Sequence, residues 1–139
     1  MVGNPKVNRS LADKAMDHID HALGRPTWPR VESFRNYFAT EAGSAEAIAF
    51  DASPHWRLRG RQRDMLFYSV TDLGRQALTD YLSQRPEYRR WRVIHRGHES
   101  IVTARTAAKA RYLHWLDIAE IMSGLRFVDY ARHISVRRA

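Results

Sequence analysis

Hydrophobic positions along this chain change between helical spacing and the short apolar runs of strands, so an alternation of helices and short strands is predicted. From Leu11 to Leu23 apolar residues recur at helical spacing, which indicates a buried stripe on a first helix. Ser10 is the expected N-cap of this helix. Gly24 and Pro26 follow it, and both residue types end helices.

A second and a third helix are expected before the first strands. The apolar residues from Val31 onward lie at helical spacing and predict a helix; they are Val31, Phe34, Tyr37 and Phe38. Residues 44–53, with the sequence SAEAIAFDAS, predict a short third helix. This third helix carries carboxylates but no Lys, Arg, Asn or Gln. Because those side chains dominate base reading in the major groove, sequence-specific DNA reading by this helix is not expected.

Residues 55–70 predict a β-hairpin that is rich in arginine. Met65–Val70 is mostly apolar and typical of an interior strand. The strand before it carries arginine at every second position, and such residues share one face of a regular strand. Thr71 is the expected cap of a following helix over Asp72–Leu82. The alternating arginines are Arg57, Arg59, Arg61 and Arg63.

The C-terminal part of the chain predicts a second small module. Strands are expected at Trp91–His95 and Ser100–Thr103 around a turn. A helix is expected over Ala104–Met122, and Ile134–Val136 is a candidate third strand. The side chains expected on the buried stripe of that helix are Ala108, Tyr112, Trp115, Leu116, Ala119 and Met122.

These elements define an α+β fold in two modules. Residues 1–9 are expected to form a flexible tail. Residues 10–84 are expected to form a winged-helix-like module of three helices, a β-hairpin and a helix. Residues 87–139 are expected to form a basic ββα(β) module packed against it.

Two resemblances accompany the predicted fold. The sequence LFYSVTDLGRQAL resembles the second wing strand and closing helix of many winged-helix proteins. The stretches HALGRP, RNYF, FYSVTDLGRQAL and AKARYLHWLD together resemble a group of small uncharacterised bacteriophage and prophage proteins. The second resemblance implies a mobile-element origin and assigns no catalytic or binding residue.

Charge is unevenly distributed in this chain of 139 residues. The net charge is +8 overall, −1 for residues 1–56 and +9 for residues 57–139. This asymmetry favours an anionic partner for the C-terminal part, although a basic surface also serves solubility. The chain has no cysteine and no apolar run of membrane-spanning length. The bacterial host cytoplasm is therefore the expected location, and no membrane partner is expected.

Catalytic and metal-binding patterns are weak. His18 and His21 are three residues apart on the first predicted helix, but no further ligand lies at metal-site spacing. His95 and His98 flank a turn and are expected to be solvated. No nucleophile elbow or phosphate-cradling glycine loop is present. The sequence therefore predicts a protein that is not an enzyme, with no metal and no cofactor.

The arginine hairpin is the strongest functional candidate. Its four guanidinium groups would grip phosphates of a nucleic acid backbone in a sequence-independent, salt-sensitive way. Alternatively, they would pair with an acidic surface of a host protein complex, as in an inhibitor of a host defence system of the anti-CRISPR type. A structural explanation is also open, in which the arginines face water and Asp64 pairs with some of them. The residues expected to extend the positive surface are Arg105, Lys109, Arg137 and Arg138.

Overall fold

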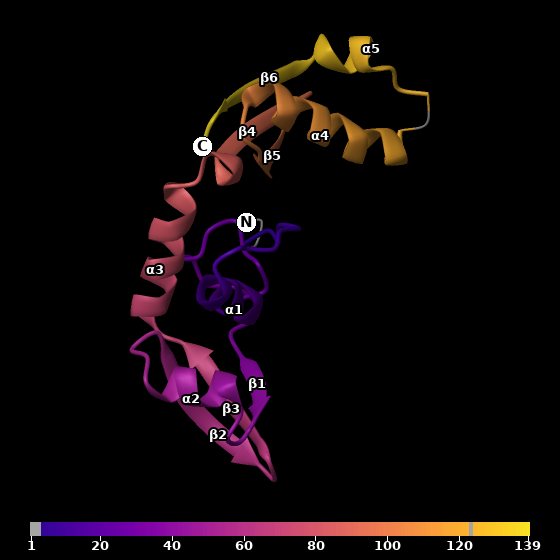
Figure 1. The fold of residues 1–139 in the computed structure, drawn as a ribbon. Coiled ribbons are helices and arrows are strands. Elements are labelled where there is room, and N and C mark those ends of the chain that lie inside the picture. The colour runs from indigo at the N-terminus through magenta and orange to yellow at the C-terminus, as the bar shows by residue number, and fades with distance from the viewer. Residues whose placement is uncertain (1–3, 123) are drawn as a thin grey trace. The chain divides into compact units, whose positions relative to one another are not determined.

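The computed structural model describes residues 4–122 and 124–139, and these form two compact units, 1–81 and 82–139. Both units mix helices with a three-stranded antiparallel sheet, so the α+β class is confirmed (Figure 1). The first unit contains α1 (Lys14–Ala22), β1 (Phe38–Glu41), α2 (Ala45–Asp51), β2 (Trp56–Gln62), β3 (Met65–Val70) and most of α3 (Asp72–Ser83). The second contains the short 3-10 helix η1 (Pro86–Tyr88), β4 (Arg90–His95), β5 (His98–Thr103), α4 (Ala107–Ile121), α5 (Phe127–Ala131) and β6 (Ile134–Arg138).

The sheet of the first unit has the strand order β1-β3-β2, and one of its faces is covered by helices. Phe50 of α2 stacks on Trp56 of β2, with 3.9 Å between ring centroids. Its ring also meets Phe38 edge-on at 5.1 Å and Tyr68 at 5.2 Å. His18 of α1 joins this cluster, 5.2 Å from the Phe38 ring. The aromatic core therefore lies on the side of the sheet that faces α1 and α2.

The first helix begins later than expected. Its N-cap is Asp13, whose side chain accepts a hydrogen bond from the backbone N–H of Met16 at 3.1 Å, so the assignment of Ser10 as the cap is wrong. The backbone N–H of Leu11 instead donates to Asp17 Oδ1 at 2.9 Å. That hydrogen bond holds the chain before Asp13 in a non-helical path.

The helix expected from Val31 is absent, and residues 31–37 have no helical structure. The side chain of Asn36 makes the two hydrogen bonds that a neighbouring strand would make with Val70. It accepts from the N–H of Val70 at 2.7 Å and donates to the carbonyl of Val70 at 3.1 Å. Phe34, expected on a buried stripe, is 79% exposed. Two helices rather than three therefore precede the hairpin in the described part of the first unit.

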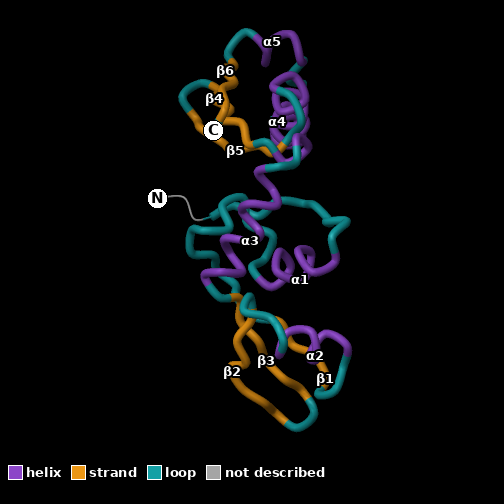
Figure 2. The backbone as a smooth tube through the Cα atoms, turned by 60° about the vertical axis from the view of Figure 1, so that its left-hand side comes forward, coloured by secondary structure: helices purple, strands orange, loops and turns teal. Residues whose placement is uncertain are grey.

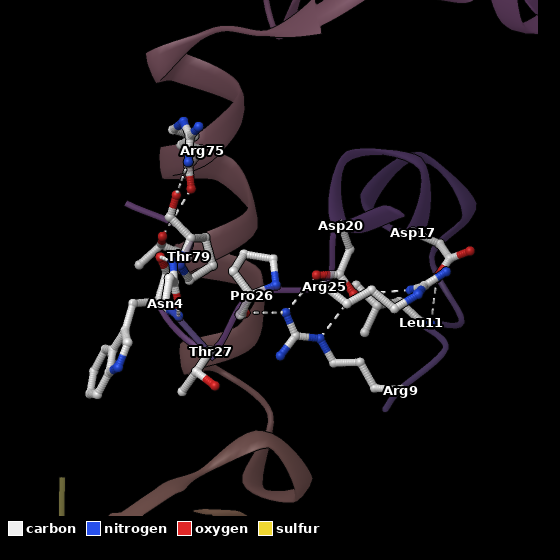
Figure 3. A network of polar contacts seen from close by, with 12 residues as sticks. Asn4, Arg9, Leu11, Asp17, Asp20, Arg25, Pro26, Thr27, Arg75 and Thr79 are labelled. Atoms are coloured by element: carbon white, nitrogen blue, oxygen red, sulfur yellow. Dashed lines mark hydrogen bonds and ion pairs between the residues drawn. The ribbon is translucent and has the colours of Figure 1, made fainter. Parts of the chain in front are cut away.

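Residues 4–9, expected to belong to a flexible tail, pack against the loop after α1, while residues 1–3 lie outside the described residues. Arg9 donates through Nε to Asp20 at 2.9 Å and also to the carbonyl of Pro26 (Figure 3). Arg25 bridges Asp20 and Asp17, at 3.0 and 2.7 Å. Because Asp20 is fully buried, these two arginines supply the charge compensation that its carboxylate requires.

The second unit has the strand order β5-β4-β6, and all three strands predicted from the sequence are present. Its core joins Val93 of β4 to Ala110 of α4, both without exposed surface. The stripe predicted for this helix is wrong, because Tyr112 is 43% and Met122 is 45% exposed. The buried face of α4 instead carries Ala110 and His114.

In the part of the chain that the structure describes, every helix is too short or too polar to cross a membrane.

Candidate nucleic-acid interface

The predicted hairpin exists, but a bulge interrupts the regular alternation of its first strand. Arg57 pairs with Ser69 and Leu58 with Tyr68, whereas Gly60 rather than Arg59 pairs with Phe67. The register shifts between Leu58 and Gly60, so Arg59 is the extra residue. A bulge of this kind bends the strand and changes which side chains share a face.

The four arginines consequently do not project from one face, and that prediction is wrong. Arg57 lies opposite Ser69, on the face away from α2. Arg61 lies opposite Leu66, which shares the face of Tyr68, so Arg57 and Arg61 are on different faces of the sheet. Arg63 lies beyond the strand in the turn, with a φ of 55°. Arg61 turns its Nε toward the carbonyl of Arg63, at 2.8 Å. Figures 1 and 2 show this turn at the end of the hairpin that points away from α1.

The first two arginines of the hairpin line a pocket of about 660 Å³. This volume lies within the range typical of ligand sites, about 300–1,000 Å³. The floor of the pocket is the face of the sheet that does not meet α2. Tyr68 points to the opposite face, where its hydroxyl donates a hydrogen bond to Asp51 of α2 at 2.8 Å. The lining residues are Asn36, Tyr37, Arg57, Arg59, Phe67, Tyr68, Ser69, Val70, Thr71 and Asp72.

Three of the lining residues are held in place by hydrogen bonds. The side chain of Asn36 is locked onto the backbone of Val70, as described above. Thr71 donates its hydroxyl to the carbonyl of Pro54 at 2.7 Å and accepts from the N–H of Gly74, which confirms it as the cap of α3. The end of the pocket next to α3 is therefore rigid, whereas Arg57 and Arg59 are exposed side chains.

The pocket has an excess of positive charge. Within residues 4–122 and 124–139, no carboxylate forms an ion pair with Arg57 or Arg59. Asp72 is the one acidic residue in the lining. Burial lowers the pKa of Arg75, and the nearby charge of Asp72 opposes that shift. The carboxylate of Asp72 therefore already interacts with a cation of α3, which reduces its effect on Arg57 and Arg59. An anion entering this pocket therefore meets two guanidinium groups that are free to bind it.

The basic residues predicted in the second unit are mostly engaged. Arg105 precedes the N-cap Thr106, so it is not on the helix, and it lies 3.6 Å from Glu87. Lys109 lies over the ring of Tyr112 at 5.5 Å. Arg138 lies over the ring of Trp91 at 5.3 Å.

The two arginines at the end of β6 do not act as one patch. Arg137 pairs with Arg92 and Arg138 with Trp91, and successive residues of a strand point to opposite faces. Arg92 is bound to Glu99 at 2.9 Å on the same sheet. The continuous basic track expected in this unit is therefore divided between two faces.

The histidines of α1 contribute to packing. His18 lies 5.7 Å from the ring of Phe50, and His21 lies 5.7 Å from the ring of Phe38. Burial, together with the charges of Arg35 and Arg25, lowers the pKa of His21. Among the described residues, no group of three potential metal ligands comes together.

A buried cluster in the second unit was missed by the sequence reasoning. His95, expected to be solvated, is 6% exposed and stacks on Tyr130 with 5.1 Å between ring centroids. His114 Nδ1 lies 2.7 Å from the Tyr130 hydroxyl, which donates to the carbonyl of Arg111 at 3.2 Å. Burial lowers the pKa of both histidines and raises that of Tyr130 to about 12. Period-2 spacing of His95 with Val93 was the available signal.

Comparison with protein-family models, curated proteins and solved structures finds no match for this chain.

Proposed function

We propose that this chain is a non-enzymatic nucleic-acid-binding protein that holds the phosphate backbone with Arg57 and Arg59. One observation carries the proposal: both guanidinium groups border one pocket on the face of the sheet away from α2, and neither has an ion-pair partner among the described residues. Guanidinium groups bind phosphate oxygens bidentately, and a polyanion removes the repulsion between two neighbouring cations.

The binding that follows from this arrangement is independent of sequence. Phosphate contacts position a protein on nucleic acid but carry no base information. The α2 helix does not supply base information either, because its Asp51 is bonded to Tyr68 and its Glu46 is a partly exposed carboxylate. Carboxylates facing phosphates are repelled, so α2 is not a recognition helix in this proposal.

The proposal includes a mobile-element origin and action in the bacterial host cytoplasm, which the resemblance of four sequence stretches supports. It also includes a winged-helix-like first unit. The succession of two helices, a hairpin with an arginine-rich first strand, and the capped helix α3 supports that arrangement. The departure from it is the stretch 31–37, which is not helical.

Binding of labelled DNA and RNA at about 50 mM and about 200 mM salt tests the proposal, because release of counterions makes phosphate binding fall steeply with salt. We expect the double variant Arg57→Gln/Arg59→Gln to bind more weakly. The slope of log affinity against log salt should decrease by about two, since each lost phosphate contact removes about one.

The matched control is Arg61→Gln/Arg63→Gln, which removes the same charge from the same hairpin outside the pocket. We expect it to retain most of the affinity. Equal losses in the two double variants would show a general charge effect and overturn the assignment to the pocket. Absence of binding, with nuclease-resistant co-purification of a host protein complex, would instead support a protein-binding inhibitor whose arginines pair with carboxylates.

A further inference from the structure

Two aromatic rings accompany the arginines on the same face of the first unit's sheet. Phe67 of β3 and Tyr37, just before β1, both line the pocket. Phe38, the neighbour of Tyr37, and Tyr68, the neighbour of Phe67, point to the opposite face, into the cluster around Phe50. Alternation along the strands therefore places Phe67 and Tyr37 on the face that α1 and α2 leave uncovered.

The ring of Phe67 lacks a side-chain neighbour at its position on β2. The residue opposite is Gly60, which has no side chain, and a Cβ built there meets no atom within 4 Å among the described residues. In the same part of the chain, no other aromatic ring is paired with Phe67. The bulge at Arg59 creates this opening, because without it Arg59 would lie opposite Phe67.

Tyr37 offers a second ring under positive charge. Its side chain is 50% exposed, and the guanidinium carbon of Arg35 lies 4.5 Å from the ring centroid. Arg35 thus covers one side of the ring, which leaves the pocket side for another planar group. A planar ligand with an attached anionic group fits such a site, because the planar part can stack on the aromatic rings while Arg57 and Arg59 bind the anionic group.

We propose that this pocket binds unpaired nucleotides, with bases stacked on Phe67 and Tyr37 and phosphates held by Arg57 and Arg59. The inference rests on the proposed function and names its substrate class as single-stranded nucleic acid. Bases inside a duplex are stacked on each other and do not expose their faces, whereas those of a single strand do. The concave shape and the volume of about 660 Å³ suit inserted bases better than the convex backbone of a duplex.

Competition between strand states tests the inference. The probes are a short labelled DNA strand of mixed sequence and the same strand annealed to its complement, measured by fluorescence anisotropy. We expect the wild-type protein to bind the single strand at least about tenfold more tightly, because stacking on each ring contributes a factor of about ten or more.

Gly60→Val is the most informative variant. The new side chain fits open space and the backbone there needs no positive φ, so folding should be preserved, but the valine would cover the Phe67 ring. We expect a loss of about tenfold in single-strand affinity, with unchanged duplex affinity and an unchanged salt slope. Phe67→Ala should give the same pattern. Leu58→Ala is the control, since Leu58 is 50% exposed on the other side of the same strand.

The outcomes separate this inference from the proposed function. Equal affinity for duplex and single strand, or full single-strand affinity in Gly60→Val, would overturn base stacking while leaving phosphate binding in place. Failure of both DNA probes to bind, together with failure of RNA probes of the same sequence in single-stranded and duplex form, would overturn the proposed function and the inference together.

Discussion

Gly74 lies directly against the backbone carbonyl of His55, so closely that a Cβ built on Gly74 would be 2.6 Å from the carbonyl oxygen. The same Cβ would be 2.6 Å from Cγ1 of Val70. The carbonyl cannot easily withdraw, because it accepts a hydrogen bond from the N–H of Thr71 at 2.9 Å. The first turn of α3 therefore depends on a residue without a side chain.

This contact reverses the usual effect of a glycine in a helix. Replacing a helical glycine with alanine ordinarily stabilises by about 1 kcal/mol. We expect Gly74→Ala to lower the free energy of unfolding, because overpacking against fixed neighbours costs about 1–3 kcal/mol. Urea denaturation followed by tryptophan fluorescence measures the change. Gly60→Ala, at a site with open space, is the control and should be close to neutral; a stabilised Gly74→Ala protein would contradict the geometry.

The correct prediction of α3 and the wrong prediction for residues 31–37 differ in the range of the interactions that determine each segment. The helix after Thr71 was predictable because its cap, its start and its apolar face are all local signals. The path of residues 31–37 depends on the side chain of Asn36 bonding to Val70, which is 34 positions away. The spacing of apolar residues cannot reveal such a long-range partner. It therefore wrongly predicted that Phe34, which is exposed, belongs to a buried stripe.

Asp20 holds the N-terminal segment to the loop after α1. Its carboxylate is fully buried and is bound by Arg9 and Arg25. We expect Asp20→Ala to lower the free energy of unfolding by about 3–5 kcal/mol, because removing one member leaves buried cations without compensation. Asp13→Ala, which removes only an exposed N-cap bond, should cost about 1 kcal/mol. Equal effects of the two substitutions in urea denaturation would refute the structural importance of the buried network.

Asp17, which shares Arg25 with Asp20, predicts that the stability of the first unit decreases in acid. Burial raises the pKa of Asp17, but the hydrogen bonds from Arg25 and from the N–H of Leu11 outweigh it, so the pKa lies below the usual 3.8. As pH falls, the unfolded chain therefore takes up this proton before the folded one does. The stabilisation is complete above the usual pKa of 3.8 and is lost as pH falls through the lower pKa of the folded protein. Asp17→Asn should flatten this part of the curve of unfolding free energy against pH; an unchanged curve would exclude Asp17 as a contributor.

The candidate site was predictable in composition but not in geometry. Alternating arginines correctly indicated an exposed charged strand, yet strict alternation placed all four on one face. Gly60 was the available signal, because a glycine within a strand often marks a bulge. The role suggested for Phe67 could not be derived from the sequence, since it depends on Gly60 lying opposite in the bulged register. On α4, apolar residues occur on several sides, so spacing alone could not select the face of Ala110.

The buried histidines predict a loss of stability in the second unit at mildly acidic pH. Burial, with the charge of Arg96 beside it, lowers the pKa of His95, and burial with the charge of His95 lowers that of His114. Both folded values lie below the usual 6.5, so their stabilising contribution is complete above about pH 6.5 and decreases as pH falls below it, when the unfolded chain is protonated first. Hydrogen-exchange protection of the β4 and β6 amides should therefore decrease from about pH 7 to about pH 5, after correction for the intrinsic exchange rate.

His95→Phe isolates this effect. The Nε2 atom of His95 is buried without a hydrogen-bond partner among the described residues, so an apolar ring that stacks on Tyr130 removes an unsatisfied group as well as a titration. We expect protection at neutral pH to be preserved or increased, because replacing an unpaired polar atom is neutral or stabilising. We also expect a weaker dependence on pH. The comparison is His98→Phe, which alters an exposed histidine opposite His95 whose charge is the smallest of the causes that lower the pKa of His95, so it should change the pH dependence much less than His95→Phe does. If His95→Phe retained the full dependence, His95 would not be its source.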